Sequence, residues 1–330
     1  MNKLVKGIAA IFASLMLFSA CDNDFDLVAD KREIPVVYAI IDAVDTAQYF
    51  RVERAFIDES VSALDIAQNP DSLYYKDAVV TLTRLSTGEA WTMQEVDGNL
   101  EGYPRQDGIF ATSPNILYKL RTEDITLEPL EEYKLTVDIG DDNPQIEATT
   151  TLIDPPFLPT PADGSAGGGL EIDPSRNFRI NWGSNSSIAI YDSYVTFFYD
   201  EIIDGQVTSK SIDWQLLRND SQNEINTSGE GFYSMLGGAL ESNSDIVRLQ
   251  KGATFTLVSG SSEISDYIRI GRANLGITSS GEIPVYEGSL NYGLGIFASR
   301  YTEIRDELTL SQLTRDSIQL HPLTIDLGFQ

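Results

Sequence analysis

The side chains that most often carry out chemistry are scarce in this chain. It holds one histidine, His321, and one cysteine, Cys21, against 50 aspartates and glutamates. A Ser-His-Asp triad would have to use His321, which precedes Pro322 in a segment expected to be extended. A structural role for His321 is therefore the preferred interpretation. Zinc sites built from Cys and His ligands are excluded by the same counts. Glycoside hydrolysis needs two carboxylates at a set spacing, and nothing in the sequence marks out such a pair.

Two short stretches have residue types suited to ligands. Gly293-Leu294-Gly295 looks like part of a dinucleotide-binding loop. The third glycine and a surrounding βαβ unit are missing, so a tightly packed turn is the preferred interpretation. Oxygen-bearing side chains that could hold calcium gather at one turn: Asp138, Asp141, Asp142 and Asn143. No Asp-x-Asp-x-Asp-Gly pattern accompanies them, so we interpret this stretch as an ordinary turn rich in Asp and Asn.

Cys21 is the residue with the clearest predicted chemistry. Two lysines form a positive n-region, residues 8–18 form an apolar stretch too short to span a membrane, and Ser19-Ala20 lead into Cys21. This arrangement resembles a bacterial lipobox, in which the signal is cut before the cysteine and the cysteine is acylated, with palmitate for example. We therefore predict a signal peptide over residues 1–20 and lipidation of Cys21. The alternative is an ordinary cleaved signal with a chance cysteine.

The stretch after the lipobox and the overall charge restrict the partners. Residues 21–32 form a predicted acidic lipid tether, and its acidic run looks like the signal that sends Bacteroidota lipoproteins to the outer face of the outer membrane. The alternative is a solvated acidic tether that does not act as an export signal. The net charge of −27 argues against nucleic acid and against adsorption to anionic lipid, because phosphate binding needs a basic face. Acylation of Cys21 would leave no thiol for a disulfide.

Hydrophobic periodicity predicts a mainly β fold. The clearest strand, residues 133–139, alternates apolar and polar side chains, as expected for one buried and one solvated face. We expect residues 33–156 to form an antiparallel β-sandwich and residues 157–176 to form a Pro/Gly linker. Residues 177–258 are predicted to form a second β-sandwich of the immunoglobulin or fibronectin type III kind. A smaller α+β C-terminal region is expected over residues 259–330.

Helical patterning is limited to a few segments. A short helix is predicted within residues 58–68, and longer ones over residues 232–240 and 262–275. The tail over residues 318–327 is predicted to be extended. Residues 286–301, rich in glycine and aromatic side chains, are predicted to form a structural corner rather than a contact surface; plain core packing is the alternative.

Several motifs, in their order along the chain, carry a family resemblance. The C-terminal one is Gly288-Ser289-Leu290-Asn291-Tyr292-Gly293-Leu294-Gly295-Ile296-Phe297. Before it come Asp77-Ala78-Val79-Val80-Thr81-Leu82, the strand Glu132-Tyr133-Lys134-Leu135-Thr136-Val137, and Ala148-Thr149-Thr150-Thr151. Together these motifs resemble a family of Bacteroidota outer-membrane lipoproteins catalogued as domain of unknown function 4249, over most of residues 33–300. The resemblance implies a surface lipoprotein found alongside TonB-dependent-transporter-like β-barrels, and it supplies no catalytic residues.

Surface modification and contact are suggested by two weaker patterns. Thr46, Ser72 and Ser317 match the Asp-Ser/Thr-aliphatic pattern that Bacteroidota use for O-glycosylation, a short pattern for which chance matches are expected. The aromatic runs Tyr74-Tyr75 and Phe197-Phe198-Tyr199 could stack on a sugar or a partner, or belong to the core.

These observations favour a protein that binds rather than catalyses, without a cofactor or metal. The preferred interpretation is a surface-exposed outer-membrane lipoprotein that acts as a binding or structural subunit. Its expected partners are membrane lipid, through acylated Cys21, and an outer-membrane β-barrel. One alternative is an accessory subunit of an outer-membrane protein assembly or secretion machine. The other is a polysaccharide-acting surface enzyme.

Overall fold

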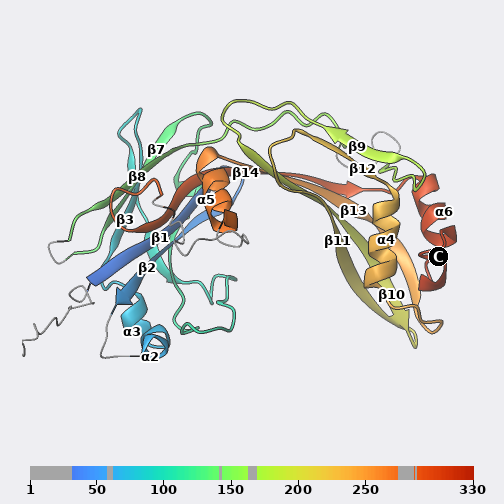
Figure 1. The fold of residues 1–330 in the computed structure, drawn as a ribbon, viewed down its shortest axis with the longest axis horizontal. Helices are drawn as coiled ribbons and strands as arrows, with labels where there is room; N and C mark the ends of the chain where they lie inside the picture. Colours follow the sequence, from blue (N-terminus) through green and yellow to red (C-terminus); the bar gives the residue numbers. More distant parts are fainter. Residues whose placement is uncertain (1–31, 58–61, 141–142, 163–168, 274–285, 287) are drawn as a thin grey trace, which may run out of the picture.

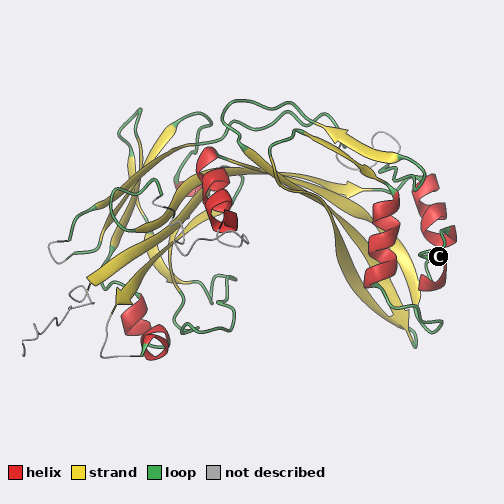
Figure 2. Ribbon diagram, in the orientation of Figure 1, coloured by secondary structure: helices red, strands yellow, loops and turns green. Residues whose placement is uncertain are grey.

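Long twisted strands run between two lobes of the molecule (Figure 1). The computed structural model describes residues 32–57, 62–140, 143–162, 169–273, 286 and 288–330. The predicted signal peptide, Cys21 and almost all of the predicted tether lie outside these residues, as does part of the predicted linker. Strands dominate both lobes (Figure 2). None of the helices in the described ranges has the length and apolar character needed to cross a membrane.

Three sheets contain the strands of the described ranges. The eight-stranded sheet has the order β11 (Gln206–Asp220), β10 (Ile190–Ile203), β13 (Val247–Gly260), β14 (Leu294–Leu308), β1 (Arg32–Asp42), β2 (Ala47–Ile57), β6 (Ile116–Arg121), β5 (Gln94–Asp97). The four-stranded sheet has the order β4 (Ala90–Thr92), β3 (Val79–Arg84), β7 (Glu132–Asp138), β8 (Ile146–Thr151). The third sheet pairs β12 (Glu224–Ser228) with β9 (Asn177–Asn181).

Helices are short and lie around these sheets. They are α2 (Ala63–Ala67), α3 (Pro70–Leu73), α4 (Glu230–Ala239), α5 (Ser262–Ala273) and α6 (Gln312–Leu320), with 3-10 turns η2 (Thr122–Asp124) and η3 (Ile325–Leu327). Helix α4 begins and ends close to its predicted bounds. The predicted extended tail is wrong, because α6 and η3 occupy it. The Ser311 hydroxyl accepts a hydrogen bond from the Thr314 N–H at 3.2 Å and caps α6, whose buried residues are Thr314 and Ile318.

The N-terminal lobe packs the four-stranded sheet against the β1, β2 and β6 part of the large sheet. Strand β7 buries Tyr133, Leu135 and Val137 and leaves the intervening side chains half-buried or exposed, which confirms the predicted alternation. These side chains share one core with Val37 and Phe50 from the other sheet. Hydrophobic burial between the two layers therefore holds this lobe together as a sandwich.

The C-terminal lobe covers one face of β10, β13 and β11 with α4, α6 and the β9–β12 pair (Figure 1). Its core is rich in aromatic rings: Phe197 contacts Phe232 edge to face at 5.6 Å, and Trp214 contacts Phe232 at 5.5 Å. The fold class, mainly β with sandwich-like sheets, is as predicted. Helices α4 and α6 supply much of the second layer here. The sequence predicted a second β-sandwich with a helix over residues 232–240, and it predicted no helix at the position of α6.

Strand β14 joins the two lobes, so residues 259–330 are not a separate C-terminal region. β13 crosses the predicted boundary at residue 258, and β14 lies between β13 and β1 in the same sheet. Its pairing with β1 is parallel, Val37 opposite Gly295, whereas its pairing with β13 is antiparallel. Phe297 enters the core of the N-terminal lobe and Leu308 enters the core of the C-terminal lobe.

The start of β14 is a close backbone contact, as predicted for the Gly293-Leu294-Gly295 turn. Gly295 has φ +119, and a Cβ atom there would lie 1.9 Å from the Val37 carbonyl oxygen. Asn291, just before this turn, hydrogen-bonds the edge of β8: its Oδ1 accepts from the Glu147 N–H at 2.7 Å, and its Nδ2 donates to the Gln145 oxygen at 3.1 Å. The residues of the C-terminal motif therefore have an architectural role.

Candidate functional site

The long connection between β5 and β6 is the feature of the described surface that most resembles a binding site. This β5–β6 loop, residues 98–115, contains no helix or strand of its own. Loops of this length in a packed domain usually carry function, because ordering a long irregular segment is costly. No sequence pattern identified this loop as a site, because its shape depends on the hydrogen bonds that its side chains form in the folded protein.

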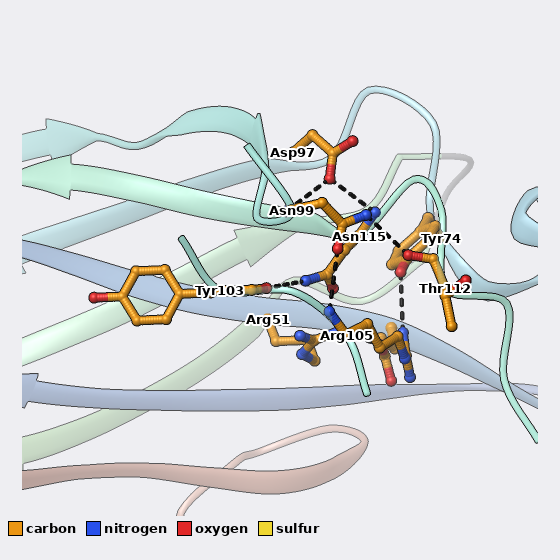
Figure 3. A network of polar contacts seen from close by, with 9 residues as sticks. Arg51, Tyr74, Asp97, Asn99, Tyr103, Arg105, Thr112 and Asn115 are labelled. Atoms are coloured by element: carbon orange, nitrogen blue, oxygen red, sulfur yellow. Dashed lines mark hydrogen bonds and ion pairs between the residues drawn. The ribbon is translucent and has the colours of Figure 1, made fainter. Parts of the chain in front are cut away.

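The base of the loop is closed by the carboxylate of Asp97 at the end of β5. Its Oδ1 accepts hydrogen bonds from the backbone N–H groups of Asn99 at 3.0 Å and Asn115 at 3.1 Å (Figure 3). The Gly98 N–H donates to the Asn115 carbonyl at 2.7 Å. Asn115 is buried, and its Nδ2 donates to the Tyr103 carbonyl at 2.8 Å. The side chains of Asp97 and Asn115 therefore hold the two ends of the loop in place.

Asn99 ties the interior of the loop together. Its Nδ2 donates to the Thr112 carbonyl at 2.9 Å, and its Oδ1 accepts from the Arg105 N–H at 3.1 Å (Figure 3). The Ala111 N–H donates to the Ala67 carbonyl of α2 at 2.8 Å. Because amide groups in the loop are paired in this way, the loop is held as a defined shape against the lobe.

Beneath the loop lies an ion-pair network on the outward face of β2. Arg105 Nη1 contacts Glu53 Oε1 at 2.7 Å and donates to the Tyr74 hydroxyl at 3.0 Å. Arg51 Nη1 reaches the same Glu53 oxygen at 2.9 Å. The Arg105 guanidinium also lies 5.1 Å from the centre of the Phe110 ring, a cation–π contact. This network joins the middle of the loop to the sheet.

A second polar cluster flanks the first on β2 and β6. The rings of Tyr49 and Tyr103 are 4.7 Å apart, and the Tyr49 hydroxyl donates to Glu101 Oε2 at 3.0 Å. Lys119 donates to the same carboxylate oxygen. The hydrogen bond from Lys119, followed by that from Tyr49, lowers the pKa of Glu101, so this carboxylate stays ionised. A charge held in this way orients the loop and is not suited to act as a general acid at neutral pH.

Apolar side chains project from this loop into solvent. Leu100 is 86% exposed, Ile109 60%, Tyr103 54% and Phe110 44%. Large apolar side chains held out on a rigid segment are typical of contact surfaces, since little conformational entropy is lost on binding. The sequence signal that could have revealed the loop is its low charge: in residues 102–114 the one exposed charged side chain is Asp107.

The catalytic candidates from the sequence are not brought together. His321 packs against Tyr233, with ring centres 4.8 Å apart, and its Nδ1 accepts from the Leu323 N–H at 3.3 Å. Within the described part of the chain, His321 forms no hydrogen bond with a carboxylate or a serine hydroxyl. The nearby Asp316 accepts instead from Gln312 Nε2 at 2.7 Å. Likewise, no three His, Cys, Asp or Glu side chains in the described ranges are grouped so as to hold a metal ion.

The turn that starts at Asp138, where calcium was the less favoured interpretation, is an ordinary Asx turn where it is described. Asp138 Oδ1 accepts from the Gly140 N–H at 2.9 Å, and Asn143 Nδ2 donates to the Gly140 carbonyl at 3.0 Å. Asp141 and Asp142 lie outside the described residues. Of the two aromatic runs, Tyr74, Tyr75, Phe197 and Tyr199 are buried, and Phe198 is 38% exposed. Both runs are therefore mostly core.

The three O-glycosylation candidates differ in accessibility. Thr46 is exposed in the turn between β1 and β2. Ser72 is half-buried in α3, where its carbonyl accepts from Arg54 Nε at 3.2 Å. Ser317 is half-buried in α6. On accessibility alone, Thr46 is the position best placed to meet a glycosyltransferase.

Comparisons with known proteins do not identify a family for this chain. No protein-family model matches the chain, and no curated protein matches it. Among solved structures, the chicken CNTN1 FN1-FN3 domains align over 68% of this chain and 59% of their own, with 10% identity and a TM-score of 0.18. The chicken interferon gamma receptor alpha chain aligns over 69% of this chain and 88% of its own, with 11% identity and a TM-score of 0.17. Because these TM-scores are low, the fold is described from the order and packing of its own sheets.

Proposed function

We propose that this chain is an outer-membrane lipoprotein, anchored through acylated Cys21 and exposed at the cell surface, that works as a non-catalytic binding subunit. The observation that supports a contact role rather than catalysis is the β5–β6 loop, which holds Leu100, Tyr103, Ile109 and Phe110 in solvent on a hydrogen-bonded base. The lipobox supports the anchor. The resemblance to the lipoprotein family described above suggests that the protein partner is an outer-membrane β-barrel.

The test is affinity purification of the native protein in mild detergent, with mass spectrometry of the co-purifying proteins and of the N-terminal peptide. We expect a diacylated or triacylated Cys21 and a transporter-like barrel in near-stoichiometric amount. Recovery with an assembly or secretion barrel instead would assign the protein to that machine. An unmodified Cys21 together with a protein purified alone would contradict the proposed function.

A further inference from the structure

The exposed apolar side chains of the β5–β6 loop belong to a protein whose surface is otherwise strongly acidic. The net charge is −27, yet residues 102–114 expose a single charged side chain, that of Asp107. The cation within this stretch, Arg105, is paired with Glu53 beneath the loop. A second copy of this chain would bring an equally negative surface toward it, which is unfavourable. The interface of a bilayer accepts Leu, Ile, Phe and Tyr side chains without a charged counterpart.

The loop also lies on the side of the lobe at which the described chain begins. Pro35 at the start of β1 is paired with Arg54 on β2, and Arg54 Nε donates to the Ser72 carbonyl of α3. Helix α2 precedes α3 directly, and its Ala67 carbonyl accepts from Ala111 of the loop. Figure 1 shows α2 and α3 on the lower side of the left-hand lobe, next to the start of β1.

The length of chain before β1 keeps this side within reach of a membrane that holds Cys21. Eleven residue steps separate Cys21 from Arg32, where β1 begins. At no more than about 3.5 Å per residue, an anchored Cys21 restrains the start of β1 to within about 40 Å of the lipid surface. The α6 end of the C-terminal lobe lies at the other end of the long axis of the molecule from the start of β1 (Figure 1).

We propose that the β5–β6 loop is a second, non-covalent membrane contact, in which Leu100, Tyr103, Ile109 and Phe110 enter the headgroup–acyl boundary of the membrane that holds Cys21. This proposal rests on the proposed function for its anchor. The acidic remainder of the surface is repelled from anionic headgroups, so the weakly charged loop is the part that faces the lipid. Because the loop is already ordered by Asp97, Asn99 and Asn115, insertion requires little further ordering. The lobe is thereby held in one orientation on the membrane.

The experiment places a fluorescent reporter at the tip and measures its contact with lipid. The mature chain is coupled through Cys21, its one thiol, to a maleimide headgroup on phosphatidylcholine vesicles, which supplies the anchor whether or not cells acylate this residue. Leu100→Trp is compared with Leu320→Trp, because Leu320 is 70% exposed on α6 of the other lobe. The unsubstituted chain gives the background from its three native tryptophans.

We expect brominated acyl chains to quench the added fluorescence of Leu100→Trp about two-fold, as expected for insertion by about 5–10 Å, and to leave Leu320→Trp unchanged. Adding Ile109→Glu to Leu100→Trp should return the signal to background, while added salt should have no effect, because apolar burial is not screened. Equal quenching of both reporters, or of neither, would overturn the proposal. If vesicles give no quenching but Leu100→Glu/Ile109→Glu removes a co-purifying protein from cells, the loop is a protein-docking site instead.

The lipid contact of the loop and the lipid anchor at Cys21 are measured independently of each other. Acylation of Cys21 and recovery of a barrel are measured on the native protein. Lipid contact by the loop is measured on the coupled chain without any partner. A chain that is not acylated in cells but is quenched at Leu100→Trp would retain the lipid contact and lose the proposed anchor.

Discussion

The two lobes place their central arginine–carboxylate pairs in opposite locations. In the N-terminal lobe, Arg105 and Glu53 meet on the outer face of β2, beneath an exposed loop. In the C-terminal lobe, Arg248 is 1% exposed and meets Glu201 inside the fold, with Nη2 to Oε1 at 2.9 Å. The first pair positions a surface for contact. The second holds the end of the chain.

The interior pair shows how the chain end is held. Arg248 Nη1 donates to the Glu241 carbonyl at 3.1 Å and also to the Leu327 carbonyl. The Arg248 backbone N–H donates to the Gly328 carbonyl at 2.8 Å and its carbonyl accepts from the Gln330 N–H at 2.9 Å. Substitutions of the Arg248–Glu201 pair should therefore lower the free energy of unfolding. Substitutions in the β5–β6 loop should weaken its proposed membrane contact and leave the free energy of unfolding almost unchanged.

Arg248→Ala is expected to have the largest effect on stability. It leaves the Glu201 carboxylate buried with Lys210 as its remaining cation, and it frees the carbonyls of the chain end. Breaking a buried ion pair costs about 3–5 kcal/mol, measurable as a lower midpoint of urea unfolding. Arg248→Lys keeps the positive charge but loses the planar set of donors, so its urea midpoint should lie between those of Arg248→Ala and the unsubstituted chain. Wild-type stability of Arg248→Ala would show that the interior pair does not hold this lobe.

Gly295→Ala tests the joint between the lobes. A Cβ at Gly295 would lie 1.9 Å from the Val37 oxygen, so β14 would have to move away from β1. Gly88→Ala is the matched control, since Gly88 also has positive φ (+72) but a Cβ atom there would meet no other atom within 4 Å. We expect Gly88→Ala to lower the free energy of unfolding by about 1–2 kcal/mol through backbone strain alone, and Gly295→Ala to lower it by about 3 kcal/mol or more. Equal losses of unfolding free energy would mean that the close approach is unimportant.

Glu201→Gln tests the interior pair through pH. Burial raises the pKa of Glu201, but hydrogen bonds from Lys210 and Arg248 outweigh it, so the pKa lies below the ordinary 4.5. The pair therefore contributes its full stability above pH 4.5, and this contribution is lost as pH falls through the folded-state pKa. We expect Glu201→Gln to cost about 2 kcal/mol at pH 7 and progressively less in acid. If the difference in unfolding free energy between Glu201→Gln and wild type stays constant from pH 7 into acid, the ionised Glu201 carboxylate does not stabilise the fold.

Arg105→Ala should have the smallest effect on unfolding and the clearest effect on the loop. Glu53 keeps Arg51 as a partner, so the loss of unfolding free energy should be about 1 kcal/mol or less. Amide hydrogen exchange in residues 98–115 should become faster, because the loop loses its tie to β2. Arg121→Ala, which removes an exposed cation of β6 outside the network, serves as the control and should leave loop exchange unchanged.

Much of the fold, but little of the candidate site, could be predicted from sequence. Period-two alternation identifies β7, because its packing requires one apolar and one polar face. Gly293 and Gly295 at the start of β14 indicate a close backbone contact. The place of β14 between β13 and β1 depends on pairing across more than 250 residues, which no local pattern records. The β5–β6 loop was missed for a related reason: Asp97, Asn99 and Arg105 acquire their roles only through partners fixed by the fold.

In the proposed orientation, the β5–β6 loop faces the membrane that holds Cys21 and the α6 end of the other lobe faces away from this membrane. Leu100→Cys and Leu320→Cys, expressed in cells, test this with a membrane-impermeant maleimide, since an acylated Cys21 leaves no other thiol in the chain. We expect labelling of Leu320→Cys on intact cells and labelling of Leu100→Cys only after detergent. Equal labelling of both on intact cells would contradict the membrane contact, and labelling of neither would contradict exposure at the cell surface.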